Sequence, residues 1–152
     1  MPDGVQDKDN GAAKLMSASK GAPVFDVGVV GAKAAQPHGK SRFTVAQVAG
    51  VHEFGSATVP KRSFIGAWFD ENLTEITEFE RKAAKLLLKG KITEEQYVNL
   101  VGSKCVSGIQ KRIASNIGPP LKAATIKRKG SSVALINEGT LRSSITIRRV
   151  SK

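Results

Sequence analysis

The chain has 152 residues, which suits a single domain and is short for two. Its 24 Lys and Arg residues outnumber its 13 Asp and Glu residues, and the formal net charge of +11 favours acidic partners. One cysteine excludes an internal disulfide framework, and two histidines are too few for a multi-histidine metal site. Aromatic residues make up 5% of the chain, which argues against a series of base-stacking platforms for single-stranded nucleic acid.

Residues 1–22 are polar and rich in small side chains, without a sustained period, which predicts a flexible N-terminal arm. The arm carries Asp3, Asp7 and Asp9 where a secretory signal has a basic head. No apolar run approaches the roughly 18 residues of a membrane-spanning helix, so we expect no membrane partner. Residues 23–152 are then expected to form one domain.

The first half of this domain begins with a strand and a short helix. Residues 24–30 are rich in β-branched side chains, which predicts a strand followed by a loop over residues 31–40. Thr44 and Gln47 have capping-box spacing, so we expect a helix of about three turns that ends at Gly55. Pro60 pushes the residue before it out of the helical region, which predicts extended chain there.

The middle of the chain predicts two long helices. From Ser63 the apolar residues recur three, four or seven apart and indicate an amphipathic helix of about six turns that ends at Gly90. This apolar stripe contains Phe69, Leu73, Ile76, Ala83 and Leu87. Thr93 and Gln96 form a second capping box, which opens a helix with a stripe from Tyr97 to Ile117. The short link predicts an antiparallel hairpin packed against a sheet.

The last third of the chain is strongly basic. Beyond Pro120 a single acid, Glu138, faces eight cations: Lys122, Lys127, Arg128, Lys129, Arg142, Arg148, Arg149 and Lys152. We expect a basic strand end before a flexible tip at residues 130–132, a helical turn at residues 140–143, and a strand over residues 144–150. The predicted fold class is α+β, a small, mainly antiparallel sheet packed by a long helical hairpin.

No catalytic, cofactor or phosphate-binding motif is complete. The stretch at residues 28–31 lacks the third glycine of a dinucleotide fingerprint, and Gly39-Lys40-Ser41 lacks the upstream glycine of a phosphate loop. Glu94 and Glu95 fall in the first turn of a helix, where acids favour the positive end of the dipole. Cys105 lies within an apolar stripe and is expected to be a small buried hydrophobe.

His52 and Glu53 place a histidine beside a carboxylate in an expected helix. Successive residues on a helix point about 100° apart, so the two side chains do not share a face. The simpler interpretation is that one of them bonds backbone or a neighbouring subunit at the helix end. We therefore expect a protein that is not an enzyme, with no catalytic or metal-binding residue and no cofactor.

Two stretches of the sequence carry a resemblance. The first is His52-Glu53-Phe54-Gly55 followed by Val59-Pro60-Lys61-Arg62-Ser63-Phe64. The second comprises Pro120-Leu121, Thr125-Ile126-Lys127-Arg128-Lys129-Gly130-Ser131, Leu135-Ile136, Gly139, Leu141 and Ser144-Ile145. Together they resemble the virion morphogenesis and tail-completion proteins of tailed bacteriophages, a family with Mu-like morphogenesis proteins and small putative tail components of siphophages.

The likeness runs from about Val24 to Val150 and departs from the family pattern at three places. Ser63 stands where a second proline is common, Ala134 where a proline often precedes the Leu-Ile pair, and Glu138 where a small hydroxyl residue often precedes the glycine. None of these differences touches a chemical group of a site, so they concern local turns and the branch of the family.

The resemblance implies a structural protein of the virion neck or tail, assembled in the host cytoplasm. It would form a homo-oligomeric ring that completes or terminates the tail and joins it to the head. Tail tubes of this class are six-fold, so a hexamer is the first expectation. The implied partners are other copies of the chain and the adjacent tail-tube and head–tail connector proteins, with DNA that passes through the ring as a further contact.

The residues assigned to subunit or ring contacts are His52, Glu53, Phe54, Pro60, Arg62, Phe64, Lys127, Arg128, Lys129, Leu135 and Leu141. Phe54 and Phe64 flank a proline-stiffened segment and suit either apolar anchors or core positions. Arg62 offers a planar fork for a carboxylate. The basic run at residues 127–129 suits acidic surfaces of neighbouring rings.

The basic last third also leaves an alternative open, a small nucleic-acid-binding protein. Affinity for duplex DNA would then fall by about 0.9 log units per log unit of salt for each phosphate neutralised.

Overall fold

Six helices and two strands lie in residues 23–135 and 139–150, the ranges that the computed structural model describes. In chain order they are β1 (Phe25–Val29), α2 (Ala32–Ala35), α3 (Val45–Phe54), α4 (Gly66–Leu88), α5 (Glu94–Ala114), α6 (Ala123–Lys129), α7 (Thr140–Ser143) and β2 (Ile145–Arg149). The expected arm at residues 1–22 lies outside the described residues. The predicted α+β class is confirmed, with one small antiparallel sheet and a long helical hairpin.

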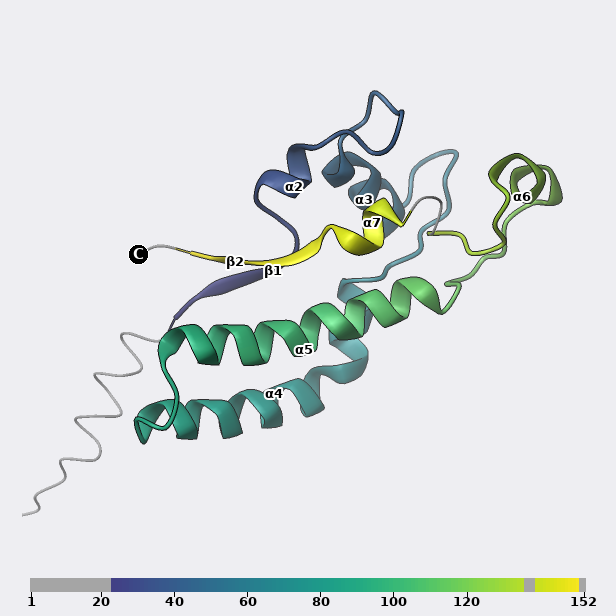
Figure 1. The fold of residues 1–152 in the computed structure, drawn as a ribbon. Coiled ribbons are helices and arrows are strands. Elements are labelled where there is room, and N and C mark those ends of the chain that lie inside the picture. The colour runs from purple at the N-terminus through teal and green to yellow at the C-terminus, as the bar shows by residue number, and fades with distance from the viewer. Residues whose placement is uncertain (1–22, 136–138, 151–152) are drawn as a thin grey trace, which may run out of the picture.

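Helices α4 and α5 form a long antiparallel hairpin along one side of the molecule, and α6 lies beyond its open end (Figure 1). Gly90 turns the chain after α4 with φ 65°, a left-handed conformation that favours glycine. Thr93 then opens α5, because its hydroxyl accepts from the N–H of Gln96 at 3.1 Å and its own N–H donates to the Gln96 side chain at 2.8 Å. Both long helices are therefore confirmed.

Two details of the predicted stripes are wrong. Leu73 is 62% exposed, because it lies outside the buried face of α4. That face is formed by Trp68, Ile76 and Ala83. The second helix ends at Ala114, so Ile117 packs against the core from the segment beyond it.

Two glycines let other elements approach α5 closely. A Cβ on Gly108 would lie 2.1 Å from Cζ2 of Trp68, and one on Gly102 would lie 2.5 Å from Cδ1 of Ile147. Glycine in a helix interior costs about 1 kcal/mol relative to alanine. Here it leaves room for the indole of α4 on one side and for β2 on the other.

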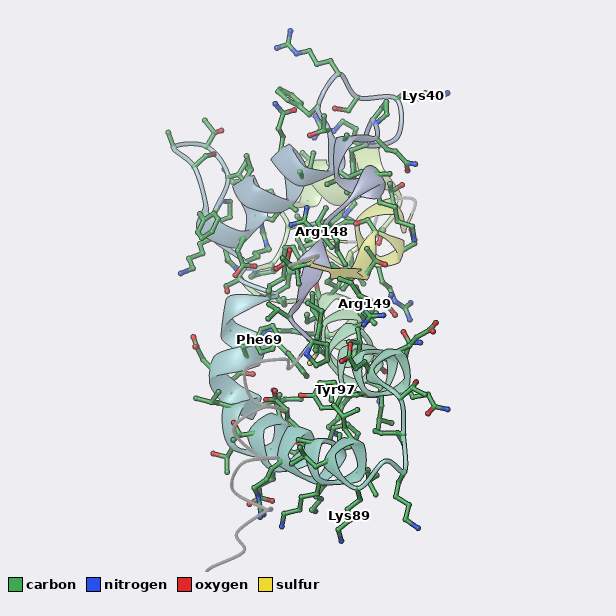
Figure 2. The ribbon with its side chains drawn as sticks, turned by 90° about the vertical axis from the view of Figure 1, so that its left-hand side faces the viewer. Lys40, Phe69, Lys89, Tyr97, Arg148 and Arg149 are labelled. Atoms are coloured by element: carbon green, nitrogen blue, oxygen red, sulfur yellow. The ribbon has the colours of Figure 1, made fainter. Side chains whose placement is uncertain are left out.

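The sheet joins the beginning of the domain to its end. β1 pairs antiparallel with β2, and Val27 lies opposite Ile147 while Val29 lies opposite Ile145. These four side chains share one face of the sheet, as the alternation of β2 predicts. On the other face Arg148 pairs with Asp26 at 2.5 Å. Figure 2 shows Arg148 of the sheet between Lys40 and Lys89, which lie at opposite ends of the molecule.

The core has two parts. The larger one gathers α3, α4, α5, α7 and β2 and contains the fully buried Phe64, Ile109 and Ile113. The smaller one lies near the turn of the hairpin, where Ala83 of α4 packs with Tyr97 and Val101 of α5. None of the helices in the described ranges is long and apolar enough to span a membrane.

Two shorter segments differ from expectation. The predicted loop at residues 31–40 contains α2, and the predicted basic strand end before Gly130 is instead helix α6. Gly130 ends this helix in the left-handed conformation, with φ 71°, and its N–H donates to the carbonyl of Ile126 at 2.8 Å. Helix α3, the turn α7 and both strands are confirmed.

Candidate functional site

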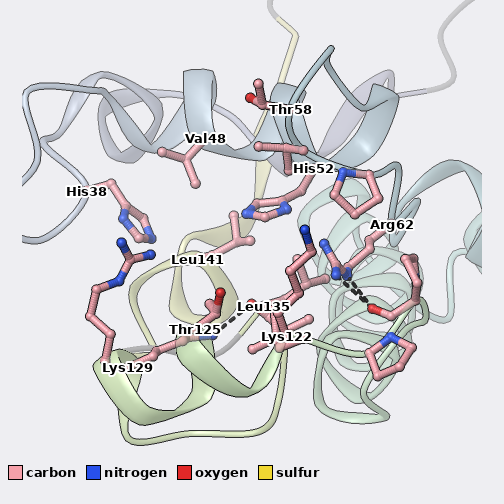
Figure 3. Close-up of a pocket in the computed structure, with 17 residues that line it drawn as sticks. His38, Val48, His52, Thr58, Arg62, Lys122, Thr125, Lys129, Leu135 and Leu141 are labelled. Carbon is pink, nitrogen blue, oxygen red and sulfur yellow. Dashed lines mark hydrogen bonds between the residues drawn. The ribbon is translucent and has the colours of Figure 1, made fainter.

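The two stretches that carry the family resemblance meet at one cleft (Figure 3). The cleft has a volume of about 830 Å³ and lies between α3 and the segment after it on one side and α6 on the other. The first stretch contributes His52, Val59, Pro60 and Arg62, and the second contributes Pro120, Leu121, Thr125, Arg128, Lys129, Leu135 and Leu141. Residues far apart in the sequence thus form one surface.

Glu53, the neighbour of the cleft residue His52, caps α4. Ile65, the N-cap residue just before α4, provides no side-chain cap for the helix. The Glu53 carboxylate instead accepts from the N–H groups of Phe64, Ile65 and Gly66 at 2.9, 3.0 and 2.9 Å, and from the Ser63 hydroxyl at 2.6 Å. The carboxylate also faces the positive end of the helix dipole. Of the two interpretations of this residue, the structure supports backbone bonding within the subunit.

These hydrogen bonds control the ionisation of Glu53. Burial raises the pKa of the carboxyl, but the hydrogen bonds from Ile65, Ser63, Gly66 and Phe64 outweigh it, so the pKa lies below the ordinary value of 4.5. Glu53 is therefore charged at neutral pH and committed to the start of α4.

Glu53→Gln is expected to lower the free energy of unfolding by about 2 kcal/mol at pH 7, because an amide nitrogen would face backbone donors. The Glu53 contribution is present above about pH 4.5 and is lost as the pH falls through the lower folded-state pKa. The difference from wild type should therefore shrink in acid. Urea unfolding followed by circular dichroism at several pH values measures this.

Glu78→Gln is the matched control, since Glu78 is an exposed residue of α4. It should leave the unfolding free energy within about 0.5 kcal/mol of wild type. Equal effects of the two substitutions would contradict the capping role of Glu53.

Arg62 is buried and holds backbone rather than a carboxylate. Its guanidinium donates from Nε and Nη2 to the carbonyl of Pro119 at 3.2 and 2.7 Å, and its N–H donates to the carbonyl of His52 at 2.7 Å. The side chain is 4% exposed. The expected grip on a partner's carboxylate is thus replaced by a link between the segment after α5 and the end of α3.

His52 and Lys129 point into the same cleft. The Nδ1 atom of His52 is buried and has no hydrogen-bond partner in the described part of the chain. Burial, and then the charges of Arg62, Lys129 and His38, lower its pKa, so His52 is neutral at pH 7. The Nζ of Lys129 donates at 2.7 Å to the carbonyls of Val133 and Ala134, and burial followed by Arg62 lowers its pKa.

The hydrogen bonds of Lys129 change the interpretation of the basic run. Lys129 turns inward and holds the loop at residues 130–134, which includes the flexible tip predicted at residues 130–132. Asn116 holds the same loop, because its Oδ1 accepts from the N–H of Ala134 at 3.1 Å. Lys127 and Arg128 remain exposed on α6. The docking surface expected here is therefore limited to these two cations.

Several residues assigned to subunit contacts are core residues. Phe64 is 0% exposed, Leu141 1% and Leu135 6%, so none of them reaches the surface of the folded chain. The alternative of a core position is confirmed for Phe64. Phe54 is 79% exposed, and Pro60 also lies at the surface. The exposed part of the predicted contact set is then Phe54, Pro60, Lys127 and Arg128.

The charged side chains that line the cleft are all basic. Lys122, Arg128, Lys129 and Arg62 line it together with two histidines, and no carboxylate of residues 23–135 or 139–150 does so. The sequence reasoning did not place Lys122 or His38 here. The clustering of basic residues after Pro120 is the signal for Lys122, but nothing local to His38 indicates which element it faces.

Metal chemistry finds no support among the residues of the described ranges, which contain no group of three His, Cys, Asp or Glu side chains able to hold an ion. The buried Cys105 has a pKa raised by burial and then by Glu80. A thiol held in its neutral form is a poor nucleophile.

No protein-family model, curated protein or solved structure matches this chain. The features that bear on function are therefore the cationic cleft and the exposed apolar residues Val51 and Phe54 of α3, in a small α+β protein built on a helical hairpin.

Proposed function

We propose that this chain is a structural bacteriophage virion protein of the neck or tail. It forms a ring of identical subunits, with six as the first expectation, that completes or terminates the tail and joins it to the head. The observation that carries the proposal is the meeting of the two family-like stretches at one cleft, although the whole helical hairpin separates them in the sequence. Residues with a shared role at a surface are expected to gather in this way.

A cyclic ring needs two different patches on each subunit, one for each neighbour. Phe54 and Val51 supply an apolar patch, because they lie three residues apart on α3 and are 79% and 38% exposed. The cationic cleft with Lys122 and Arg128 supplies a patch of different chemistry. The two patches support a heterologous contact.

The chemistry around His52 also supports a structural role. An acid–base site needs two groups that reach one substrate. Glu53 is occupied by the start of α4, while the Nδ1 of His52 lies buried without a partner among the described residues. These two side chains therefore do not form a catalytic pair.

Phe54→Ala is expected to weaken ring assembly by about 2 kcal/mol, roughly 30-fold in the dissociation constant, as for an aromatic anchor at an interface. Light scattering coupled to size-exclusion chromatography measures the assembly of the purified chain. Leu73→Ala removes an exposed apolar side chain from α4 and serves as the control. Normal assembly of the Phe54 variant would show that Phe54 does not contribute to the subunit interface.

The function itself is tested in the phage that encodes the chain. Mass spectrometry of purified virions should find the protein, and blocking its synthesis should yield separate heads and tails under the electron microscope. Absence of the chain from virions, or normal virions without it, would refute the proposal.

Replacing Lys127 and Arg128 by Ala is expected to reduce tail joining while the unfolding free energy stays within about 0.5 kcal/mol of wild type, since both side chains are exposed. Complementary charge between rings steers their association. Lys129 is left intact because it holds the adjacent loop. Joining at the wild-type rate together with loss of salt-dependent duplex binding would favour the nucleic-acid-binding alternative.

A further inference from the structure

The cationic cleft has the chemistry of a site for a short acidic peptide. Its apolar floor includes the partly exposed Val59 and Leu121, and Lys122 and Arg128 are exposed cations on its wall. A suitable ligand combines carboxylates with a small apolar side chain. The cleft residues of the described ranges include no Phe, Tyr or Trp, the large aromatic side chains on which single-stranded nucleic-acid binders stack bases.

The beginning of this chain has the complementary pattern. Acidic and apolar residues occupy alternate positions there: Asp3, Val5, Asp7 and Asp9. In an extended chain, alternate side chains share one face. That face would present three carboxylates around a valine, while Gly4, Gln6 and Lys8 would take the opposite face.

The arm is long enough to reach a cleft beyond the far end of α5, in its own copy or in a neighbouring one. Phe25 of β1 packs with Tyr97 and Val98 at the start of α5, whereas Pro119 and Pro120 of the cleft follow the end of α5. The length of α5 separates these ends by about 31 Å at 1.5 Å per residue. The chain from residue 9 to residue 23 spans up to about 46 Å when extended.

We propose that residues 3–9 of one copy bind in the cationic cleft of a neighbouring copy. The acidic segment and the cleft are two different patches, so this contact is heterologous and propagates around a ring. The inference deepens the proposed function and rests on its ring of identical subunits. The carboxylates would contact Lys122 and Arg128, and Val5 would face the apolar floor.

A disulfide-trapping experiment with the full chain tests the contact. Val5→Cys keeps all three carboxylates, and Thr125→Cys places a thiol on the part of α6 that lines the cleft. The two variants are purified separately, one of them labelled with ¹⁵N, and then mixed and oxidised. The expected product is a covalent dimer with one copy of each. Lys127→Cys is the control, because Lys127 is exposed on α6 and is not among the lining residues.

A mixed dimer formed with Thr125→Cys and at least about tenfold less with Lys127→Cys supports the proposal. Equal yields from the two positions would overturn it. A bond that forms only within single chains carrying both Val5→Cys and Thr125→Cys would also overturn it, because the arm would then occupy its own cleft.

A second measurement distinguishes a specific contact of the arm from a general effect of the protein's net charge. Changing Asp3, Asp7 and Asp9 to Asn should weaken association of the full chain by about tenfold or more in light scattering. The matched control changes three exposed acids elsewhere, Asp70→Asn, Glu78→Gln and Glu95→Gln, and should alter association less than about twofold. Equal weakening would refute the arm contact.

The two proposals fail in different ways. Absence of the protein from virions would refute the proposed function and leave the trapped dimer standing. Rings that form normally from the arm variant would refute the arm contact and leave the function standing.

Discussion

Phe64→Ala is expected to lower the free energy of unfolding by about 3–5 kcal/mol, because it removes a fully buried aromatic side chain. Phe64 lies in the larger core cluster with Val45, Trp68 and Ile109, which come from α3, α4 and α5. These elements would line a cavity that they can close only in part. Urea unfolding followed by circular dichroism measures the change.

Phe54→Ala is the matched control because it makes the same chemical change at a side chain that is 79% exposed. Its unfolding free energy should stay within about 0.5 kcal/mol of wild type. A stable Phe64 variant with a specific loss of assembly would contradict the core position. The expected pattern is instead that Phe64 governs folding and Phe54 governs association.

Gly108→Ala is expected to lower the free energy of unfolding by about 3 kcal/mol through overpacking. The new Cβ would lie 2.1 Å from Cζ2, 2.3 Å from Cε2 and 2.5 Å from Nε1 of Trp68, so the indole or the helix must move. Trp68 is 8% exposed and packs edge-on against Phe69, with ring centroids 5.0 Å apart. The higher helix propensity of alanine offsets only about 1 kcal/mol of this effect.

Fluorescence of Trp68, the single tryptophan of the chain, reports this change directly during urea unfolding. Gly50→Ala is the control, because a Cβ on this residue of α3 meets nothing within 4 Å. It should raise stability by up to about 1 kcal/mol. If Gly108→Ala were as well tolerated as Gly50→Ala, the close approach of α4 and α5 at this point would be wrong.

Most helix boundaries followed from the sequence by itself, because they depend on neighbours three or four residues apart. Thr44 and Gln47 define the start of α3 within one turn, and Thr93 and Gln96 do the same for α5. The helix ends at glycines are also predictable from the local sequence. The alternation of β2 predicted that Ile145 and Ile147 share a face, which the register confirms.

Helix α6 shows where local patterns were ambiguous. Thr125 and Ile126 are β-branched, which favours a strand, whereas the residues around them tolerate a helix. Gly130 ends that helix. Lys129 then holds the following loop, because its ammonium group donates to the loop carbonyls four and five residues further along the chain. The spacing of apolar residues over so short a segment does not distinguish a helix from a strand.

The sequence by itself determined the α+β class, the hairpin and the exclusion of a disulfide framework and multi-histidine metal site. Tertiary structure decided that Glu53 caps α4, that Phe64 is core while Phe54 is exposed, and that Lys122 and His38 share a cleft with Arg62. These outcomes depend on pairs of residues separated by 10 to more than 80 positions. Local periodicity predicts which face of a helix or strand is buried. Only tertiary packing decides which element covers that face and which polar groups come into contact.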